Sequence, residues 1–133
     1  IVAYNAVDDC GNVINHAIVE GQVHGAVMQG AGQIFGEQVV YDRDTGQMLT
    51  GSFMDYCMPR AGALVRQIRM QDAPLPSVSN TLGVKGVGES GCTASMPWLA
   101  NAMMDALRPL GVRSVDMPFT PAKVWHAIQT ARK

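Results

Sequence analysis

The stretch Gly83-Val84-Lys85-Gly86-Val87-Gly88-Glu89-Ser90-Gly91 separates the part of the chain with most of the strand signals from a part with two helical signals. Four of these nine residues are glycine. Repeated glycines cost backbone entropy, so they are expected where the chain turns tightly or where a ligand approaches its N–H groups. One carboxylate, that of Glu89, stands near the end of this loop and is the principal candidate for a functional group.

Several short segments have the composition of strands. They are residues 2–7, 38–41, 47–49, 52–58 and 67–72. The turn formers Asp42-Arg43-Asp44-Thr45-Gly46 lie between the second and third of these segments, which is typical of an antiparallel hairpin. Pro59 is expected to end the strand at 52–58, and Pro74 and Pro76 end regular structure before the glycine loop.

Three longer segments are predicted to be helices. Residues 15–37 contain no proline, although five glycines weaken this helix by about 5 kcal/mol in total. Leu99 to Leu110 keep helical spacing, with Ser95 as the expected cap and Pro97 in the first turn. The last helix is expected to begin with Thr120 as cap and Pro121 at its first position. Because strands and helices do not strictly alternate, we predict an α+β fold with short antiparallel strands and about three helices.

The first predicted helix carries a face of small residues. On a period of 3.6 residues, Gly21, Gly25, Gly32 and Gly36 fall on one narrow face, with Gln29 at its edge. Such a face lets another backbone or a flat ligand approach closely, and tight packing alone explains it equally well. The carboxamide of Gln29 can donate and accept hydrogen bonds at once, so this residue is a second candidate for ligand contact.

Length and composition exclude several classes of protein. A chain of 133 residues is long enough for one domain with its own core, and we expect a single domain over residues 1–133. The net charge of -1 and the pI near 6.3 argue against a nucleic-acid binder. No apolar run approaches the roughly 20 residues that span a bilayer, so a soluble protein of the cytoplasm or periplasm is expected. The start, Ile1-Val2-Ala3-Tyr4, is interpreted as a strand of a longer protein.

The cysteines bear on redox chemistry. Cys10, Cys57 and Cys92 are far apart and odd in number, so neither a disulfide framework nor a zinc site is expected. Three cysteines are too few for a four-thiolate iron–sulfur cluster. Electron transfer would therefore need another domain or polypeptide.

Besides a functional Glu89, the glycine loop admits two other interpretations from its residues alone. Glu89 can be an acid that only stabilises the start of a helix, where the dipole favours negative charge. The glycines can also form a phosphate-binding nest. The Walker pattern fails, however, because Lys85 precedes the glycine pair, and no buried strand precedes the loop as a dinucleotide fingerprint requires.

Beyond this loop, several motifs stand in the order typical of the large subunit of the xanthine dehydrogenase family of molybdenum hydroxylases. They are residues 7–15 (VDDCGNVIN), 19–25 (VEGQVHG), 29–33 (QGAGQ), 51–56 (GSFMDY) and 83–91. The tail, Pro109 to Arg113 and Asp116 to Pro121, is similar to the carboxy-terminal end of those subunits. The resemblance therefore identifies residues 1–133 as the carboxy-terminal portion of a molybdopterin-binding subunit, within the family that includes aldehyde oxidases and carbon monoxide dehydrogenases.

This resemblance implies roles for particular residues. Glu89 would be the general base beside molybdenum in the oxidation of an aldehyde, an N-heterocycle or carbon monoxide with oxygen from water. Gln29 and the backbone of Lys85, Gly86, Val87 and Gly88 would contact the pterin cofactor. No residue of this chain is expected to bind a metal directly.

The resemblance also implies a cofactor and partners. The cofactor is expected to be molybdopterin in its cytosine dinucleotide form. Iron–sulfur clusters and FAD would lie on partner subunits or domains, and the remainder of the molybdopterin subunit would complete the site. Alone, the chain is expected to be inactive.

The chain departs from the family pattern at several positions. His16 stands where proline is usual, but it is eight residues from His24 and no acid partner is evident, which argues against a metal site. Ala26, Ser90 and Cys92 are further departures, and none of them is the proposed base. The alternative function is a non-catalytic domain that keeps the loop, with Glu89 at a helix start and the glycine face docked on partner subunits. A nucleotide-binding module is a third alternative.

Overall fold

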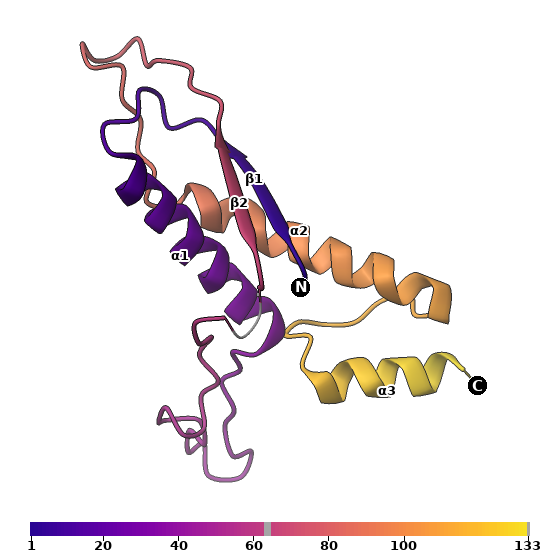
Figure 1. Ribbon diagram of the computed structural model, residues 1–133. Helices are drawn as coiled ribbons and strands as arrows, with labels where there is room; N and C mark the ends of the chain where they lie inside the picture. The colour runs from indigo at the N-terminus through magenta and orange to yellow at the C-terminus, as the bar shows by residue number, and fades with distance from the viewer. Residues whose placement is uncertain (63–64, 133) are drawn as a thin grey trace. The chain divides into compact units, whose positions relative to one another are not determined.

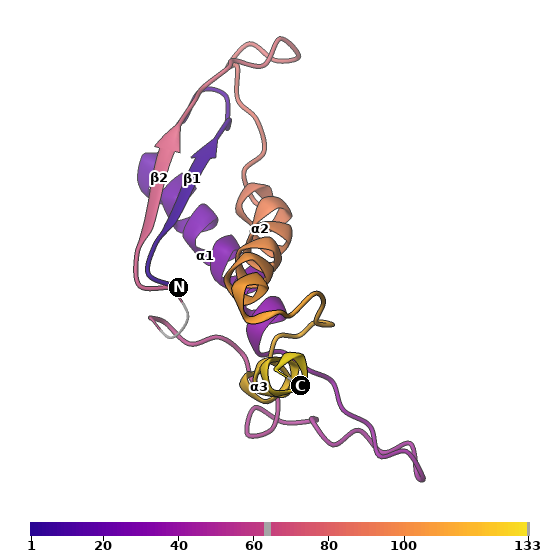
Figure 2. The same cartoon turned by 90° about the vertical axis from the view of Figure 1, so that its right-hand side faces the viewer.

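The computed structural model describes residues 1–62 and 65–132 and divides the chain into two compact units. Unit 1 comprises Ile1–Gly30 and Ala61–Ser95, and unit 2 comprises Ala31–Arg60 and Met96–Lys133. Figures 1 and 2 show the chain from two directions. Within the described residues, every helix is too short or too polar to cross a bilayer. The expectation of a single domain stays a prediction.

Unit 1 contains a pair of parallel strands, which differs from the antiparallel strands that we expected. Strand β1 (Tyr4–Asp8) pairs with β2 (Ile68–Asp72) in parallel, in a register that sets Tyr4 opposite Ile68 and Asp8 opposite Asp72. Figures 1 and 2 show the two strands side by side. A parallel pair needs a long connection, and here helix α1 and the segment after it lie between the two strands in sequence.

The expected helix of residues 15–37 is confirmed as α1 (His16–Phe35), and its glycines lie in two different settings. Gly36 has Cys57 beside it, and a Cβ on Gly32 would lie 2.7 Å from Pro59. A Cβ on Gly21 or Gly25 would meet no atom of the described chain within 4 Å. Close packing therefore explains the last two glycines of this face, and the first two face open space in this chain.

Helix α2 (Ser90–Leu107) starts five residues earlier than the sequence indicated. Ser95 is fully buried inside the helix and Pro97 lies in its interior, so both assignments to the first turn were wrong. The hydroxyl of Ser95 donates to the carbonyl of Cys92, 3.1 Å away, which satisfies this polar side chain without a cap position. A short 3-10 helix, η1 (Arg108–Leu110), follows α2.

Unit 2 holds the remaining elements. The predicted hairpin is present as a bridge between Tyr41 and Met48, but residues 52–58 form a turn and an extended segment instead of a strand. The turn arises because the Ser52 hydroxyl donates to Asp55 and the Ser52 carbonyl accepts from Tyr56 N. Helix α3 (Pro121–Ala131) begins as predicted, with the Thr120 side chain accepting from Lys123 N.

Buried apolar side chains form the cores of the two units. In unit 1 they are Tyr4, Cys10, Val19, Val23, Ala26, Val27 and Val65, and in unit 2 Ala31, Ile34, Leu99, Leu107, Val112 and Phe119. Phe119 is held by its N–H, which donates to the carbonyl of Ile34, and its ring lies 6.4 Å from that of Phe35. Three helices and a small sheet confirm the predicted α+β class.

Two carboxylates oppose each other at the end of the parallel pair. Asp8 and Asp72 are direct register partners, and one oxygen of each is buried without a hydrogen-bond partner among the described atoms. Burial, and then the charge of Asp72, raise the pKa of Asp8 above its ordinary value of 3.8. The His16 Nδ1 lies 3.2 Å from Asp72, so His16 has the acid partner that the sequence did not reveal.

Replacing Asp8 by Asn should stabilise the fold at neutral pH. Because its pKa is raised in the folded state, the contribution of wild-type Asp8 is fully present below 3.8 and is lost as pH rises through the folded value. Asp8→Asn removes the like-charge pair, a gain of roughly 0.2–1 kcal/mol at pH 7 that disappears near pH 3. Urea unfolding at the two pH values measures the difference.

Asp42→Asn is the matched control with the opposite sign. Hydrogen bonds from the Thr45 side chain, Thr45 N and Asp44 N lower the pKa of Asp42, so its contribution is present above 3.8 and is lost as pH falls. This variant should lose stability at pH 7 and little near pH 3. Equal pH dependence of the two variants would contradict the assignment.

Candidate functional site

The first half of the glycine loop is fixed by hydrogen bonds to a turn that follows β1. The carbonyl of Gly83 accepts from Asn12 N at 2.9 Å, and Lys85 N donates to the carbonyl of Cys10 at 3.1 Å. These bonds flank an antiparallel bridge between Gly11 and Val84. The Asn12 side chain adds a bond to the carbonyl of Leu82 at 2.8 Å. The start of the loop is thus held along its backbone.

The approach at this bridge requires glycine at position 11. Gly11 has a φ of +62°, and a Cβ there would overlap the carbonyl oxygen of Gly83 and lie 3.1 Å from Lys85 N. An L side chain rarely adopts this φ, and backbone atoms cannot move aside as a flexible side chain can. Gly11, in the turn that follows β1, therefore determines how closely the glycine loop can approach this turn.

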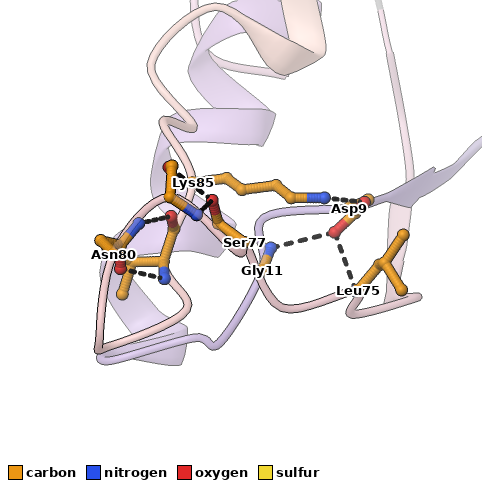
Figure 3. Close-up of polar contacts among 8 residues, drawn as sticks. Asp9, Gly11, Leu75, Ser77, Asn80 and Lys85 are labelled. Carbon is orange, nitrogen blue, oxygen red and sulfur yellow. Dashed lines mark hydrogen bonds and ion pairs between the residues drawn. The ribbon is translucent and has the colours of Figure 1, made fainter.

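Two polar side chains reinforce the same half of the loop, as Figure 3 shows. The Asn80 carboxamide donates to the carbonyl of Val84 at 3.0 Å and accepts from Val84 N at 3.1 Å. The Asp9 Oδ1 accepts from Gly11 N and Leu75 N, each at 3.0 Å, and its Oδ2 lies 2.5 Å from Lys85 Nζ. Asp9 therefore joins three segments of the chain.

The charge of Asp9 is stabilised by these contacts. The hydrogen bond from Lys85, followed by those from Leu75 N and Gly11 N, lowers the pKa of Asp9 to about 2. The carboxylate is therefore ionised at any physiological pH. Its partner Lys85 is occupied within the chain, since its ammonium lies on this carboxylate.

The second half of the loop is open. Gly86 and Gly88 are exposed, and a Cβ on either would meet no described atom within 4 Å. Within residues 1–62 and 65–132, no hydrogen bond uses the backbone N–H of Gly86, Val87 or Gly88. Three successive donors without side-chain obstruction can approach an anionic or flat ligand.

Glu89 has a fixed backbone and a free side chain. Its carbonyl accepts from Cys92 N, from Thr93 N and from the Thr93 hydroxyl, at 3.1 to 3.2 Å. Its side chain is exposed, and in the described part of the chain the carboxylate has no hydrogen-bond or ion-pair partner. The acid is thus presented at the start of α2, as the sequence indicated.

The first turn of α2 is held against α1. A Cβ on Gly91 would lie 2.7 Å from the carbonyl oxygen of Val23 and 3.0 Å from the Cβ of Ala26. Gly91 therefore permits a contact that any larger residue would disturb. Since Glu89 lies two residues earlier, this contact fixes the loop at its second end.

Gln29 lies on α1 and is exposed. None of the described hydrogen bonds joins it to the glycine loop, so the structure does not link the two candidates by direct contact. The described residues also contain no group of three or more His, Cys, Asp or Glu side chains that could hold a metal ion.

Sequence reasoning missed Asp9 and Asn80 as residues of this site. Asp and Gly are common turn residues, which suits the bond between Asp9 and Gly11 N. Its ion pair with Lys85 joins residues 76 positions apart, and no local spacing indicates such a contact. Asn80 ends the stretch Ser77-Val78-Ser79-Asn80, whose composition indicates only a loop.

Comparisons with known proteins show what this chain is similar to. Residues 1–65 match the family model of a molybdopterin cofactor-binding domain. The chain is 42% identical over 122 residues to the nicotine 6-hydroxylase large subunit of Paenarthrobacter nicotinovorans, a match that covers 92% of this chain and 15% of that protein. The chain therefore spans only a small part of this relative's length.

Solved structures give the same result. The fold matches a Cu,Mo-CO dehydrogenase in its carbon monoxide reduced state with a TM-score of 0.87 and 34% identity, over 96% of this chain and 16% of that chain. It matches quinoline 2-oxidoreductase from Pseudomonas putida 86 with a TM-score of 0.88 and 38% identity, over the same shares of the two chains.

The comparisons correct one expectation and confirm a broader one. The expectation of a carboxy-terminal portion is not supported, and the match to the cofactor-binding model covers residues 1–65, the N-terminal part of this chain. The similarity to a molybdopterin cofactor-binding domain and the α+β fold are confirmed. The chain is thus a homologue of part of the large, molybdopterin-binding subunits of molybdenum hydroxylases.

Proposed function

We propose that this chain supplies the general base and one wall of the cofactor site of a molybdenum hydroxylase. The observation that carries the proposal is the contrast at Glu89, whose backbone is fixed by three hydrogen bonds while its carboxylate has no described partner. An acid that only stabilised a helix start would be expected to accept bonds from the free N–H groups there. A general base needs an ionised carboxylate free to reach its proton.

The open half of the loop fits a molybdopterin cofactor. The N–H groups of Gly86, Val87 and Gly88 are unused in the described chain, and a side chain at either glycine would fill the space in front of them. The N–H of Lys85 is bonded to Cys10, so contact through this residue would come from its carbonyl oxygen. Gln29 would add an amide donor and acceptor from α1. We propose the cytosine dinucleotide form of the cofactor.

When bound, the molybdenum centre supplies a Lewis acid and an acceptor for two electrons. The role of this chain is proton transfer: the Glu89 carboxylate accepts the proton of the oxygen nucleophile that derives from water. A carboxylate on a short loop between two fixed ends loses little orientation freedom on reaction. We propose oxidation of an aldehyde or N-heterocycle, or of carbon monoxide, as the reaction.

Substrate choice is proposed to lie outside this chain. The similar proteins carry names that specify nicotine, carbon monoxide and quinoline, and this stretch is shared by all three. A shared stretch suits the common steps, which are cofactor contact and proton transfer. We propose that the remainder of the large subunit shapes the substrate pocket, and that partner subunits or domains carry iron–sulfur clusters and FAD.

Replacing the proposed base should stop turnover without loss of cofactor. In the complete enzyme, Glu89→Gln keeps the size of the side chain and removes the proton acceptor, so turnover should fall by at least about a hundredfold. Molybdenum content, measured by elemental analysis, should stay unchanged. Glu20→Gln is the matched control, because Glu20 is an exposed acid on α1 whose side chain is 61% exposed.

Near-normal turnover of Glu89→Gln would overturn the catalytic proposal. It would favour the alternative, a non-catalytic domain in which Glu89 marks a helix start and the chain docks on partner subunits. The observation that favours this alternative is the open space in front of Gly21 and Gly25, where a partner could pack.

Removing the carboxamide of Gln29 should weaken cofactor retention. Gln29→Ala in the complete enzyme should lower the molybdopterin content per subunit severalfold, because a buried cofactor group would lose its hydrogen-bond partner. Gln22→Ala is the matched control, since Gln22 is an exposed glutamine two turns earlier on α1. Equal cofactor content in the two variants would remove Gln29 from the proposed site.

A further inference from the structure

The carboxylate of Asp9 organises the loop that carries Glu89. Its Oδ1 accepts two backbone N–H groups, from Gly11 in its own turn and from Leu75 in the segment before the loop. Its Oδ2 accepts from Lys85 Nζ within the loop itself. Figure 3 shows these contacts converging on Asp9. One side chain thus joins its own turn to two segments that lie 66 and 76 residues later in the sequence.

Lys85 marks the boundary between the two halves of the loop. Residues before it are bonded along their backbone, and the three residues after it use none of their N–H groups within the described chain. Its side chain runs past Gly11, where a Cβ would lie 3.2 Å from Lys85 Cγ. Lys85 is therefore held at both its backbone and its ammonium, and the open half begins at a fixed point.

The open half is short and bounded at both ends. Gly86, Val87 and Gly88 lie between Lys85 and Glu89, and the backbone of Glu89 belongs to the start of α2, which packs on α1 through Gly91. The position of Lys85 therefore sets where the short segment that leads to Glu89 begins. Misplacement of about 1 Å at a reacting group can cost about a hundredfold in rate.

We propose that Asp9 is a positioning residue for Glu89, acting through its ion pair with Lys85. This inference rests on the proposed function of Glu89. A direct consequence is that Lys85 contributes its backbone to the cofactor wall, because its ammonium is held by Asp9 instead of by an anionic group of the cofactor. The pair is partly exposed, with side-chain exposures of 32% for Lys85 and 37% for Asp9. Such pairs contribute little to global stability, so the effect should be local.

The alternative role of Lys85 makes a different prediction. If its ammonium binds the cofactor, removing it lowers cofactor content, and removing Asp9 leaves the cofactor in place. If the ion pair positions the loop, removing either partner has the same effect and removing both adds nothing further. A double-mutant cycle therefore separates the two roles.

The test compares Asp9→Asn, Lys85→Met and the double variant in the complete enzyme. Asparagine keeps an oxygen for the two N–H groups and loses the charge, and methionine keeps the stem and loses the ammonium. We expect kcat to fall about tenfold in each variant and in the double variant, with KM and molybdenum content unchanged. Asp105→Asn, which removes an exposed carboxylate of α2, is the control and should leave kcat unchanged.

A second readout is independent of activity. Amide hydrogen exchange is measured by mass spectrometry on the cofactor-free large subunit, for the peptide that contains residues 83–85, because their N–H groups donate hydrogen bonds within the chain. Exchange should accelerate about tenfold in Asp9→Asn and in Lys85→Met alike, because local opening becomes easier. Lys85→Arg keeps a cation for Asp9 and should stay closer to the wild type than Lys85→Met.

Three results would overturn the proposal: unchanged exchange at residues 83–85, additive effects of the two substitutions, or loss of cofactor in Lys85→Met alone. A failure of the proposed function of Glu89 would be detected by a different experiment. Near-normal turnover of Glu89→Gln would remove the catalytic role of Glu89, whereas the exchange data would still decide whether Asp9 and Lys85 act as a pair.

Discussion

The region around the glycine loop depends on one close approach of backbone to backbone. The turn after β1 passes the loop at Gly11, where a Cβ would overlap the carbonyl oxygen of Gly83. Because Gly11 has no side chain and tolerates a φ of +62°, bonds form on both sides of it, between Asn12 and Gly83 and between Cys10 and Lys85. The parallel strands bring this turn into place, and the loop position follows from it.

This constraint divides the loop into parts with different roles. The bonded part, residues 83–85, uses its polar backbone groups within the chain. The open part, residues 86–88, leaves its donors free, and α2 then fixes Glu89 from the other side. A loop that was flexible throughout would lose entropy on ligand binding, whereas one held at both ends has already lost most of it. The arrangement therefore suits a site that must be formed before its ligand arrives.

Local signals predicted the elements but not their pairing. Helix α1, the strands at 4–8 and 68–72, and the Thr120-Pro121 start of α3 follow from spacing, length and capping chemistry. The parallel sense of the strands does not, because it depends on a long connection and not on strand composition. Ser95 resembled a helix cap because a serine followed two residues later by proline suits a helix start. In the structure Ser95 is buried inside α2, and its hydroxyl donates a hydrogen bond to the carbonyl of Cys92.

Asp8 and Asp9 show why residue type alone does not fix a role. They are neighbours in sequence, but β1 ends at Asp8, and Asp9 lies in the turn that follows. Asp8 lies opposite Asp72 with a buried oxygen, so its charge is disfavoured and its pKa raised. Asp9 lies beyond the strand end, meets two N–H groups and an ammonium, and its pKa falls to about 2. A carboxylate is thus a cost opposite Asp72 in the strand and a fixed anion in the turn after it. Because only Asp9 bonds to the glycine loop, the point at which β1 ends determines which of the two acids contacts the loop that carries Glu89.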